Sequence, residues 1–411
     1  MFQFRHACLL YALISNSDDS IKLMKSLNGM LNSWLGRGAW VLLCAIAFAL
    51  PARAGNGVYV STNPNGANAV LAYTRNVKSG LLTYVGRFDT GGRGLVDIGG
   101  AQSHAVVATR TQLFVVNPGS NDFTTFALRD DGSLLFMGVT SSGGVRPVSI
   151  TVSGNVIYVL NQGQLGVATA SCNGFTIGDD GLPVSIGTYD VIYEAEAMPT
   201  DVFFTRNGAR LVVLLNGSDA IDTFSASVDG ALTVNRRLTG VSNPVGGTMS
   251  PVQPFVAFAA LDDDTTPRMI SIRATGTALP SIVSSAGLAS TISPCWAAAT
   301  PNGKKVWSSN FASGSLTLFA GKLNGSIRAV SSYVPASSSP GSLDVAVDQR
   351  GKFLYRLRAV NPSGGAAPVP VIEAMKITKS TANGGVQLVQ TVSLPSDLQT
   401  ASPTGIVVTA P

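Results

Sequence analysis

From about residue 57 onward, hydrophobic positions fall in short runs separated by polar turns. Some runs are continuous and rich in small and β-branched residues, as in HAVVAT (104–109), DVFFT (201–205) and LDVAVD (343–348). Strands that are covered on both faces have this composition. No segment in this part of the chain shows the three-to-four-residue apolar period of an amphipathic helix. The 44 glycines and 21 prolines supply turns, so the pattern predicts an all-β chain.

A unit of four strands repeats along the chain. Clear copies span Ser103–Thr140, Pro199–Leu238 and Pro294–Ser332, and weaker copies begin near Arg146, Asn243 and Pro340. Second strands are expected to end 44 to 55 residues apart, at Asn63, Asn117, Asn161, Asn216, Ala260, Asn310 and Arg358. Four-stranded repeats of ~40–50 residues are typical of β-propeller blades. We therefore predict a seven-bladed β-propeller of four-stranded antiparallel blades, formed by residues 55–411 as a single domain.

The two ends of this region complement each other. The first copy lacks an innermost strand before Gly57, and the chain finishes with SPTGIVVTA (402–410), which reads as a lone strand. Pairing of this strand in blade one would close the ring and leave no inner edge unpaired.

The residues before the repeat indicate export. Ala39–Leu50 is a 12-residue apolar run, which is shorter than the ~20 residues that span a bilayer. Lys25 and Arg37 precede it, and Ala52 and Ala54 follow in an A-x-A arrangement. These features describe a secretory signal peptide. We expect residues 1–54 to be a leader that is cleaved near Ala54, and the protein to be secreted or periplasmic, without a membrane span.

Charge and cysteine content exclude several classes of protein. Only 12% of the residues are charged, and residues 55–411 hold 23 basic and 21 acidic residues, a net charge of +2. A nucleic-acid binder needs a strongly basic surface, so no nucleic-acid partner is expected. Cys172 and Cys295 remain after the leader. They are expected in distant blades, as small buried hydrophobes rather than as a disulfide.

Propeller geometry brings candidate chemistry to one face. The innermost strands start on the face where the loops between second and third strands lie, around the central channel. His104, Arg146 and Asp201 start successive blades there. They could form a hydrolytic site, with His104 as base or proton donor, Arg146 stabilising an oxyanion, and Asp201 orienting the histidine or acting as base. The alternative is structural: Arg146 pairs with Asp201, and His104 bridges backbone groups.

Further polar and aromatic residues at this face are candidates for ligand binding. They are Asn117, Gln162, Asn216, Trp296 and Asn310. Asparagine at strand ends also stabilises turns, and Trp296 could either stack on a ring or belong to the core. Asp262–Asp264 lacks the spacing of a calcium loop and reads as a solvated loop. Phosphate-loop, dinucleotide, zinc and nucleophile-elbow motifs are absent from the sequence, so no metal or cofactor is expected.

Three stretches carry a family resemblance. They are VYVSTN (58–63), LFVVNPGSNDFTTFALRDDGSL (113–134) and SGGVRPVSITVSGNVIYVLNQG (142–163). They resemble the secreted seven-bladed β-propeller lactonases, related to 6-phosphogluconolactonase-type and carboxymuconate-cyclase-type propellers with YVTN-type repeats. Active members of that family usually carry P-R-H at the start of an inner strand and N-E at the end of the next. In this chain Cys295 and Trp296 occupy the Arg and His positions, and Phe311 follows Asn310.

Two hypotheses follow. The resemblance implies a lactonase-like hydrolase that opens a sugar or small organic lactone at the channel mouth, and the missing family residues leave His104 and Arg146 to supply comparable groups. The alternative is a non-catalytic propeller that binds a small carbohydrate-like ligand or a protein partner on the same face, because fold alone does not decide function.

Overall fold

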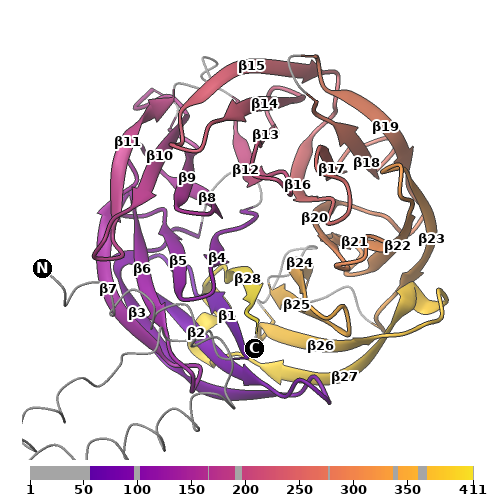
Figure 1. The fold of residues 1–411 in the computed structure, drawn as a ribbon. Helices are drawn as coiled ribbons and strands as arrows, with labels where there is room; N and C mark the ends of the chain where they lie inside the picture. The colour runs from indigo at the N-terminus through magenta and orange to yellow at the C-terminus, as the bar shows by residue number, and fades with distance from the viewer. Residues whose placement is uncertain are drawn as a thin grey trace, which may run out of the picture. The chain divides into compact units, whose positions relative to one another are not determined.

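The computed structural model describes residues 56–96, 102–164, 166–189, 197–275, 278–336, 341–359 and 368–410. The predicted leader and its cleavage near Ala54 lie outside the described residues. Seven four-stranded antiparallel sheets form a ring (Figure 1). The described residues fall within one compact unit, Pro51–Pro411, and contain no α-helix, only the 3₁₀ turns Asn383–Gly385 (η1) and Ser396–Thr400 (η2). The predicted fold class is confirmed.

Each blade is one sheet, whose strands run in order from the innermost to the outermost. Blade one is β28 (Thr404–Val408), β1 (Gly57–Ser61), β2 (Ala67–Arg75) and β3 (Leu82–Arg93). Blade two is β4 (Val106–Ala108), β5 (Gln112–Asn117), β6 (Asp122–Leu128) and β7 (Leu134–Ser141). Blade three is β8 (Pro147–Ser153), β9 (Val156–Asn161), β10 (Ser171–Ile177) and β11 (Pro183–Tyr189). Blade four is β12 (Pro199–Phe204), β13 (Arg210–Leu215), β14 (Ala220–Ala226) and β15 (Leu232–Thr239).

The remaining three blades follow the same order. Blade five is β16 (Pro244–Met249), β17 (Val256–Leu261), β18 (Arg268–Arg273) and β19 (Ser281–Ala286). Blade six is β20 (Pro294–Ala299), β21 (Lys305–Asn310), β22 (Leu316–Gly321) and β23 (Ile327–Tyr333). Blade seven is β24 (Gly341–Val347), β25 (Phe353–Ala359), β26 (Val371–Ile377) and β27 (Val386–Ser393).

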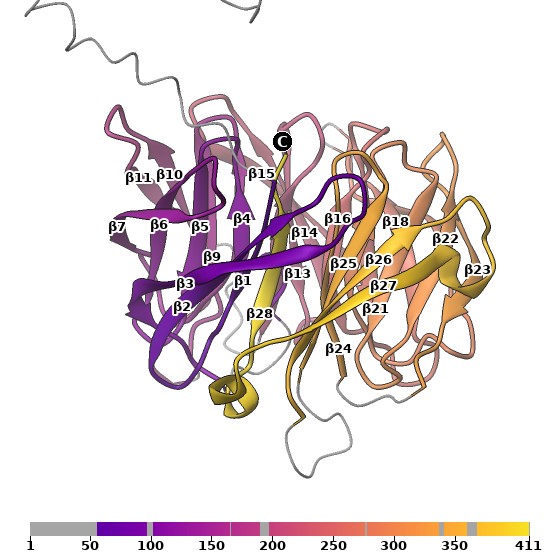
Figure 2. The same cartoon turned by 90° about the horizontal axis from the view of Figure 1, so that it is seen from below.

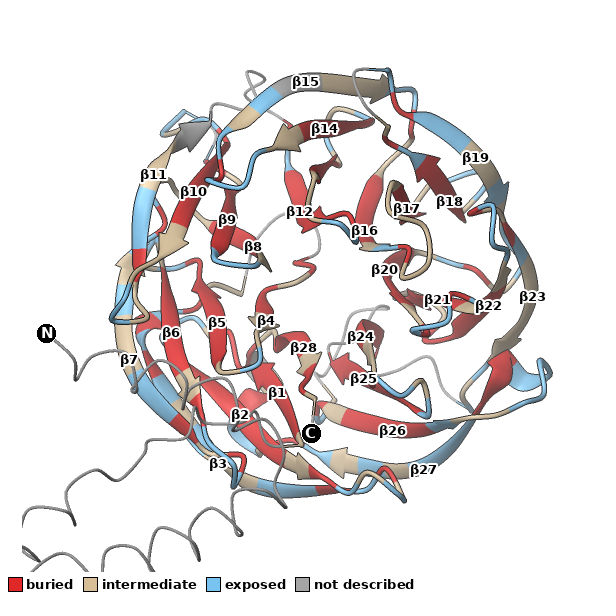
Figure 3. Ribbon diagram, viewed as in Figure 1, coloured by how far each residue is buried: buried red, intermediate tan, exposed pale blue. Residues whose placement is uncertain are grey.

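Burial falls from the inside of the ring to the outside. The second strands β5, β9, β13 and β17 are buried at every position, whereas outermost strands such as β7 alternate or are exposed (Figure 3). The core therefore lies between neighbouring blades. One cluster joins blades six, seven and one through Trp307, Leu357 and Val60. Cys172 and Cys295 are both buried and free, as predicted.

The C-terminal strand closes the ring, as the incomplete first repeat predicted. β28 pairs with β1 in antiparallel register, with Val58 opposite Val408, and it lies between β1 and β24 of blade seven (Figure 2). The backbone N–H of Gly57 also donates to Thr409 Oγ1 at 2.9 Å. The last strand of the chain thus becomes the innermost strand of the first blade.

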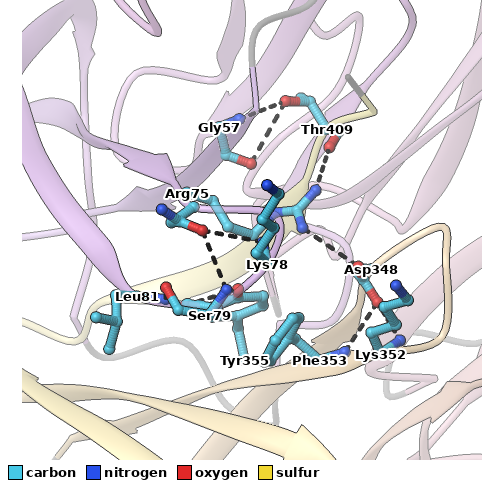
Figure 4. Close-up of polar contacts among 12 residues, drawn as sticks. Gly57, Arg75, Lys78, Ser79, Leu81, Asp348, Lys352, Phe353, Tyr355 and Thr409 are labelled. Atoms are coloured by element: carbon cyan, nitrogen blue, oxygen red, sulfur yellow. Dashed lines mark hydrogen bonds and ion pairs between the residues drawn. The ribbon is translucent and has the colours of Figure 1, made fainter.

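A buried ion pair reinforces the closure (Figure 4). Arg75 of β2 donates from Nη1 to Asp348 Oδ2 of blade seven at 3.2 Å, and both side chains are essentially inaccessible. The other Arg75 nitrogen, Nη2, donates to the carbonyl of Thr409 at 3.5 Å. Asp348 Oδ1 accepts the backbone N–H groups of Lys352 and Phe353. One arginine therefore connects blade one, blade seven and the C-terminal strand.

Candidate active site

The inner strands enter the ring through a repeated local irregularity. Arg146, Met198, Asn243 and Ser293 each have a positive φ and each precede the proline that begins an inner strand. A β-bulge follows directly in each case. Bulges change the direction in which a side chain points. The residues just after these prolines, such as Ser149 and Asp201, are therefore aimed differently from residues of a regular strand.

His104 and Asp201 form the central contact of the site. His104 Nδ1 lies 2.8 Å from Asp201 Oδ1. The carboxylate is fully buried, whereas the histidine side chain is 33% exposed. Phe203 of β12 packs beside the imidazole, with ring centroids 5.9 Å apart. Within the described residues, Nε2 of His104 has no hydrogen-bond partner, so the second ring nitrogen is available to a ligand.

The histidine is held as a cation. Burial disfavours the imidazolium, but the charge and hydrogen bond of Asp201, together with the charge of Asp344, raise the pKa of His104 from 6.5 to about 9. A histidine with this pKa is protonated at neutral pH, and both ring nitrogens then donate. His104 therefore offers an N–H donor and a positive charge rather than a free base. Of the two roles that the sequence left open, the structure favours the proton donor.

Two further contacts orient the Asp201 carboxylate. Ser149 Oγ donates to the same oxygen, Oδ1, at 3.1 Å, and itself accepts the N–H of Val202 at 3.1 Å. The backbone N–H of Gly247 donates to Oδ2 at 2.8 Å. Because Ser149 binds the carboxylate rather than the imidazole, the three residues do not have the geometry of a Ser-His-Asp triad, in which serine contacts the histidine. They make a histidine–aspartate dyad.

The residues before β4 cross toward the ring axis (Figure 1). We call Gln102–His104 the axial segment. The carbonyl of Gln102 accepts Trp296 Nε1 of blade six at 3.1 Å and Thr404 Oγ1 of blade one at 3.0 Å. The carbonyl of His104 accepts the N–H of Ile150 in blade three at 3.0 Å. His104, itself at φ 53°, is thus held by contacts that come from several blades.

The axial segment also contains buried polar atoms without hydrogen-bond partners among the described residues. Gln102 Oε1 and Ser103 Oγ are buried, and the described residues provide neither with a hydrogen-bond partner. Buried polar atoms of this kind are usually satisfied by water or a ligand. The site therefore has polar groups close in sequence to the exposed imidazole edge.

Arg146 lies on the same face but outside the dyad. Its backbone N–H donates to Asn121 Oδ1, and its carbonyl accepts the N–H of Gln162, both at 2.9 Å. Its side chain is half-buried and forms no ion pair with any described residue. The alternative pairing of Arg146 with Asp201 is wrong, because the ion partner of Asp201 is His104. Arg146 keeps a guanidinium that is not committed to a carboxylate.

Two of the predicted ligand-binding asparagines are structural in their contacts. Asn117 is fully buried. Its side-chain amide forms hydrogen bonds with Asp122, Thr124 and Asn68. Asn310 is equally buried and donates to Ser315 and Thr317. These contacts tie the end of a second strand to the third strand, which is the turn-stabilising interpretation. Neither side chain reaches a surface on which a ligand could bind.

The other three predicted ligand-binding residues differ in their surroundings. Trp296 is buried in the core of blades six, seven and one, and its indole N–H is used by Gln102. Asn216 is half-buried and donates to Asn243 and to the carbonyl of Pro244. Gln162 is half-buried beside Arg146. Their role in binding stays a prediction.

Asp344 is the residue near the dyad to which the sequence assigned no role. It lies in the middle of β24 in blade seven, and its carboxylate is buried. Oδ1 accepts the N–H of Val345 at 2.7 Å, and Oδ2 accepts the N–H of Ile406 at 3.0 Å. The signal was its place in LDVAVD, where an acid interrupts the apolar residues of an expected inner strand. The contact with Ile406 depends on ring closure, which a strand pattern cannot show.

Two hollows on the described surface offer fewer reactive side chains than the ring axis. A hollow of about 370 Å³ between blades three and four, near Gly154, Phe204 and Val228, has no titratable residue in its lining. A second hollow, of about 570 Å³, lies near Thr265, Arg268 and Thr291, and its Arg268 is already paired with Asp263 at 2.6 Å. The described residues contain no cluster of side chains suited to a metal ion. Side-chain chemistry therefore places the candidate site at the ring axis.

No helix within the described residues has both the length and the apolar character needed to cross a bilayer.

Comparisons with known proteins identify the fold. No family model and no curated protein matches the sequence. Among solved structures, a protein from Bacteroides fragilis provisionally named a 6-phosphogluconolactonase has a TM-score of 0.65 at 17% identity, covering 86% of this chain and 98% of that one. The periplasmic gluconolactonase of Pseudomonas aeruginosa has a TM-score of 0.64 at 15% identity, covering 86% and 99%.

A third similar structure has no assigned activity. It is a functionally unknown protein from Desulfotomaculum acetoxidans, with a TM-score of 0.64 at 11% identity, and the match covers 87% of this chain and all of that one. These likenesses confirm the predicted resemblance to 6-phosphogluconolactonase-like seven-bladed propellers. At such identities they establish the fold and leave the chemistry to be argued from the site.

Proposed function

We propose that this protein is a lactonase-type hydrolase that opens a sugar lactone or small organic lactone at the ring axis. The observation that carries the proposal is the His104–Asp201 dyad, whose histidine is partly exposed and has a second imidazole nitrogen that is unpartnered among the described residues. The fold shared with proteins named gluconolactonases supports the same reaction class. An unphosphorylated substrate fits better than a phosphorylated one, since His104 and Arg146 are the only basic residues among the predicted starts of the inner strands.

The proposed role of His104 is that of an acid. When the ester carbonyl is attacked by water, negative charge develops on the carbonyl oxygen and then on the ring oxygen that leaves. An imidazolium N–H within hydrogen-bond distance stabilises this charge and can protonate the leaving alkoxide. Asp201 holds the ring by its Nδ1–H and so directs Nε2 outward, the orienting role of the aspartate in hydrolytic triads. The Arg146 guanidinium is the second candidate to stabilise the oxyanion.

Replacement of His104 tests this proposal. His104→Gln keeps a polar side chain of similar size but removes the acid, and we expect kcat/KM for lactone hydrolysis to fall by about 10²–10⁴-fold. Acid release from gluconolactone-type and aromatic lactones can be followed in a pH-stat. Arg110→Ala is the matched control, because Arg110 is exposed beyond the opposite end of β4. Unchanged turnover in the His104 variant would reject the assignment.

A non-catalytic binding protein is the second candidate. It is favoured by the structural contacts of the site residues: Ser149 binds the backbone of blade four and Asp201 binds the backbone of blade five. In this case the dyad would fasten neighbouring inner strands, and the face would bind a small carbohydrate-like ligand or a protein. Absence of acid release from every lactone tested, with saturable binding of a lactone or sugar acid by calorimetry, would favour this function.

Export is a separate part of the proposal. The apolar run Ala39–Leu50, with basic residues before it and A-x-A after it, supports removal of residues 1–54 and a secreted or periplasmic location. N-terminal sequencing of the protein recovered from the exported fraction should begin near Gly55. Recovery of the intact chain from the cytoplasm alone would contradict it.

A further inference from the structure

The protonated His104–Asp201 dyad does not supply the general base that the proposed hydrolase needs. His104 is a cation at neutral pH. The Asp201 carboxylate is taken up by His104, Ser149 and the backbone N–H of Gly247. A hydrolytic reaction that uses water as nucleophile needs a group to accept the proton of that water.

A second buried carboxylate lies in the electrostatic reach of the dyad. Asp344 lies in the middle of β24, the innermost strand of blade seven, and the charges of His104 and Asp201 both act on it. It is also linked to the axial segment through structure: Ile406, which donates to Asp344 Oδ2, stands two residues from Thr404, which donates to the carbonyl of Gln102. These two hydrogen bonds, each between a side chain and the backbone, join Asp344, β28 and the axial segment in one group at the ring axis.

The carboxylate oxygens of Asp344 can still accept a proton, because their hydrogen bonds do not use all their lone pairs. Each of its oxygens accepts one backbone N–H, whereas an ionised carboxylate has about four acceptor sites. Its side chain has no partner with a full positive charge in direct contact among the described residues. Burial, opposed by the charge of His104 and by the two backbone hydrogen bonds, raises the pKa of Asp344 from 3.8 to about 6. Such a carboxylate is ionised at pH 7 yet readily accepts a proton.

We infer that Asp344 is the general base of this site and His104 its general acid, an assignment that rests on the proposed lactonase function. Asp344 takes a proton from water as the water oxygen bonds to the lactone carbonyl carbon. The bond between that carbon and the ring oxygen breaks, and His104 Nε2–H protonates the ring oxygen. The product is a hydroxy acid, the proton on Asp344 returns to His104, and the new carboxylic acid releases one proton to solvent. Two titratable groups with pKa values displaced in this way make an acid–base pair.

The same contacts give Asp344 a structural function that the experiment has to separate. Its bond to Ile406 joins the inner strands of blades seven and one. Asp344→Asn keeps an oxygen for that N–H and removes the negative charge. Ser309→Ala is the matched control. Ser309 Oγ contacts Ser342 and the carbonyl of Leu343. This variant therefore loses a buried hydrogen bond between blades six and seven, next to Asp344, but no charge.

The kinetic test is the pH profile of kcat/KM. For the wild-type protein we expect a bell with an acid limb near pH 6 and an alkaline limb near pH 9, from Asp344 and His104 respectively. Asp344→Asn should lower kcat by about 10²–10⁴-fold with little change in KM, and the acid limb should disappear. Ser309→Ala should keep both the bell and the turnover.

A second readout does not need turnover. The imidazole of His104 can be titrated by NMR, and loss of the Asp344 charge should lower the pKa of His104, while Ser309→Ala leaves it unchanged. If wild-type protein hydrolyses lactones and Asp344→Asn retains kcat and the acid limb, the base assignment is overturned and the proposed function stands. If the His104 titration is the same in wild type and Asp344→Asn, the two groups are not coupled and the assignment is also overturned. A wild-type protein without lactonase activity overturns both proposals.

Discussion

The two ion pairs Arg75–Asp348 and His104–Asp201 both join residues that are far apart in the sequence, but they differ in what they leave open. At the ring closure both side chains are inaccessible, and the carboxylate is filled by backbone N–H groups. At the axis the carboxylate is equally buried, but the imidazole is partly exposed and keeps one nitrogen unpartnered among the described residues. A pair that is buried on all sides stabilises the fold, whereas a pair with an exposed, unpartnered donor is suited to act on a ligand.

Among these changes, removal of the closing strand should lower the stability of the fold most. Deletion of residues 404–411 takes away β28, including the buried Ile406 and Val408. It removes one hydrogen-bond partner each from Asp344 and Arg75 and leaves the inner edge of β1 unpaired. At about 1.5–3 kcal/mol for each buried aliphatic side chain, with the lost strand pairing added, we expect destabilisation of at least about 5 kcal/mol. Denaturant unfolding should then show no cooperative transition. Deletion of residues 410–411 alone is the control and should unfold as the wild type does.

Disruption of the closed pair comes next. Arg75→Ala leaves Asp348 as a buried carboxylate without its cation, and breaking a buried pair in this way typically costs about 3–5 kcal/mol. Lactone turnover by the protein that remains folded should be unaffected, since Arg75 lies outside the axial site. Urea unfolding gives the stability and the pH-stat gives the turnover. A loss of turnover without a loss of stability would mean that the two pairs are not separate in function.

The difference between the two regions also marks what the sequence could predict. The period of the repeat, the second-strand ends and the closing strand follow from local patterns of apolar residues and turns, and the structure agrees with them closely. For example, Asn161 and Asn310 are the last residues of β9 and β21. The dyad was predicted only as part of a group of three neighbouring candidates. Its geometry depends on a bulge at Pro199–Asp201 and on a positive φ at His104.

Contacts between distant blades could not be predicted from the sequence. The axial segment binds Trp296 and Thr404, which are separated from it by about half or more of the chain, and Asp344 meets Ile406 through the closure. A pattern of single strands gives the face on which a residue starts but not the partner that it finds on another blade. The same limit explains Asn117, which was expected to bind a ligand and is nevertheless buried.

The open pair should also affect stability in a pH-dependent way, to a smaller extent. A histidine with a folded-state pKa of about 9 stabilises the fold fully below its unfolded value of 6.5, and this contribution is lost as the pH rises through 9. Because the side chain is one-third exposed and screened, we expect only about 1–2 kcal/mol. The difference in unfolding free energy between wild type and His104→Gln should be greatest near pH 6.5 and small above pH 9.

The titration of Asp344 does not affect the unfolding free energy in the pH range where His104 titrates. Its raised pKa contributes stability below pH 3.8 that is lost by about pH 6, so the two groups act in successive pH ranges. A constant difference between wild type and His104→Gln from about pH 6.5 to pH 9 would show that the imidazole is neutral in the folded protein, and the assignment of His104 as acid would then be wrong.

The smallest effect is expected from an ion pair of the closure region that is open to solvent. Arg87 Nη1 lies 2.6 Å from Asp397 Oδ2, and both side chains are substantially exposed. This pair, like Arg75–Asp348, joins blade one to a distant part of the chain, but exposed pairs contribute only about 0–1 kcal/mol. Arg87→Ala should therefore shift the urea midpoint slightly, and the shift should vanish in high salt because exposed charges are screened. A loss as large as that of Arg75→Ala would mean that location at the closure, rather than burial, sets the strength of these pairs.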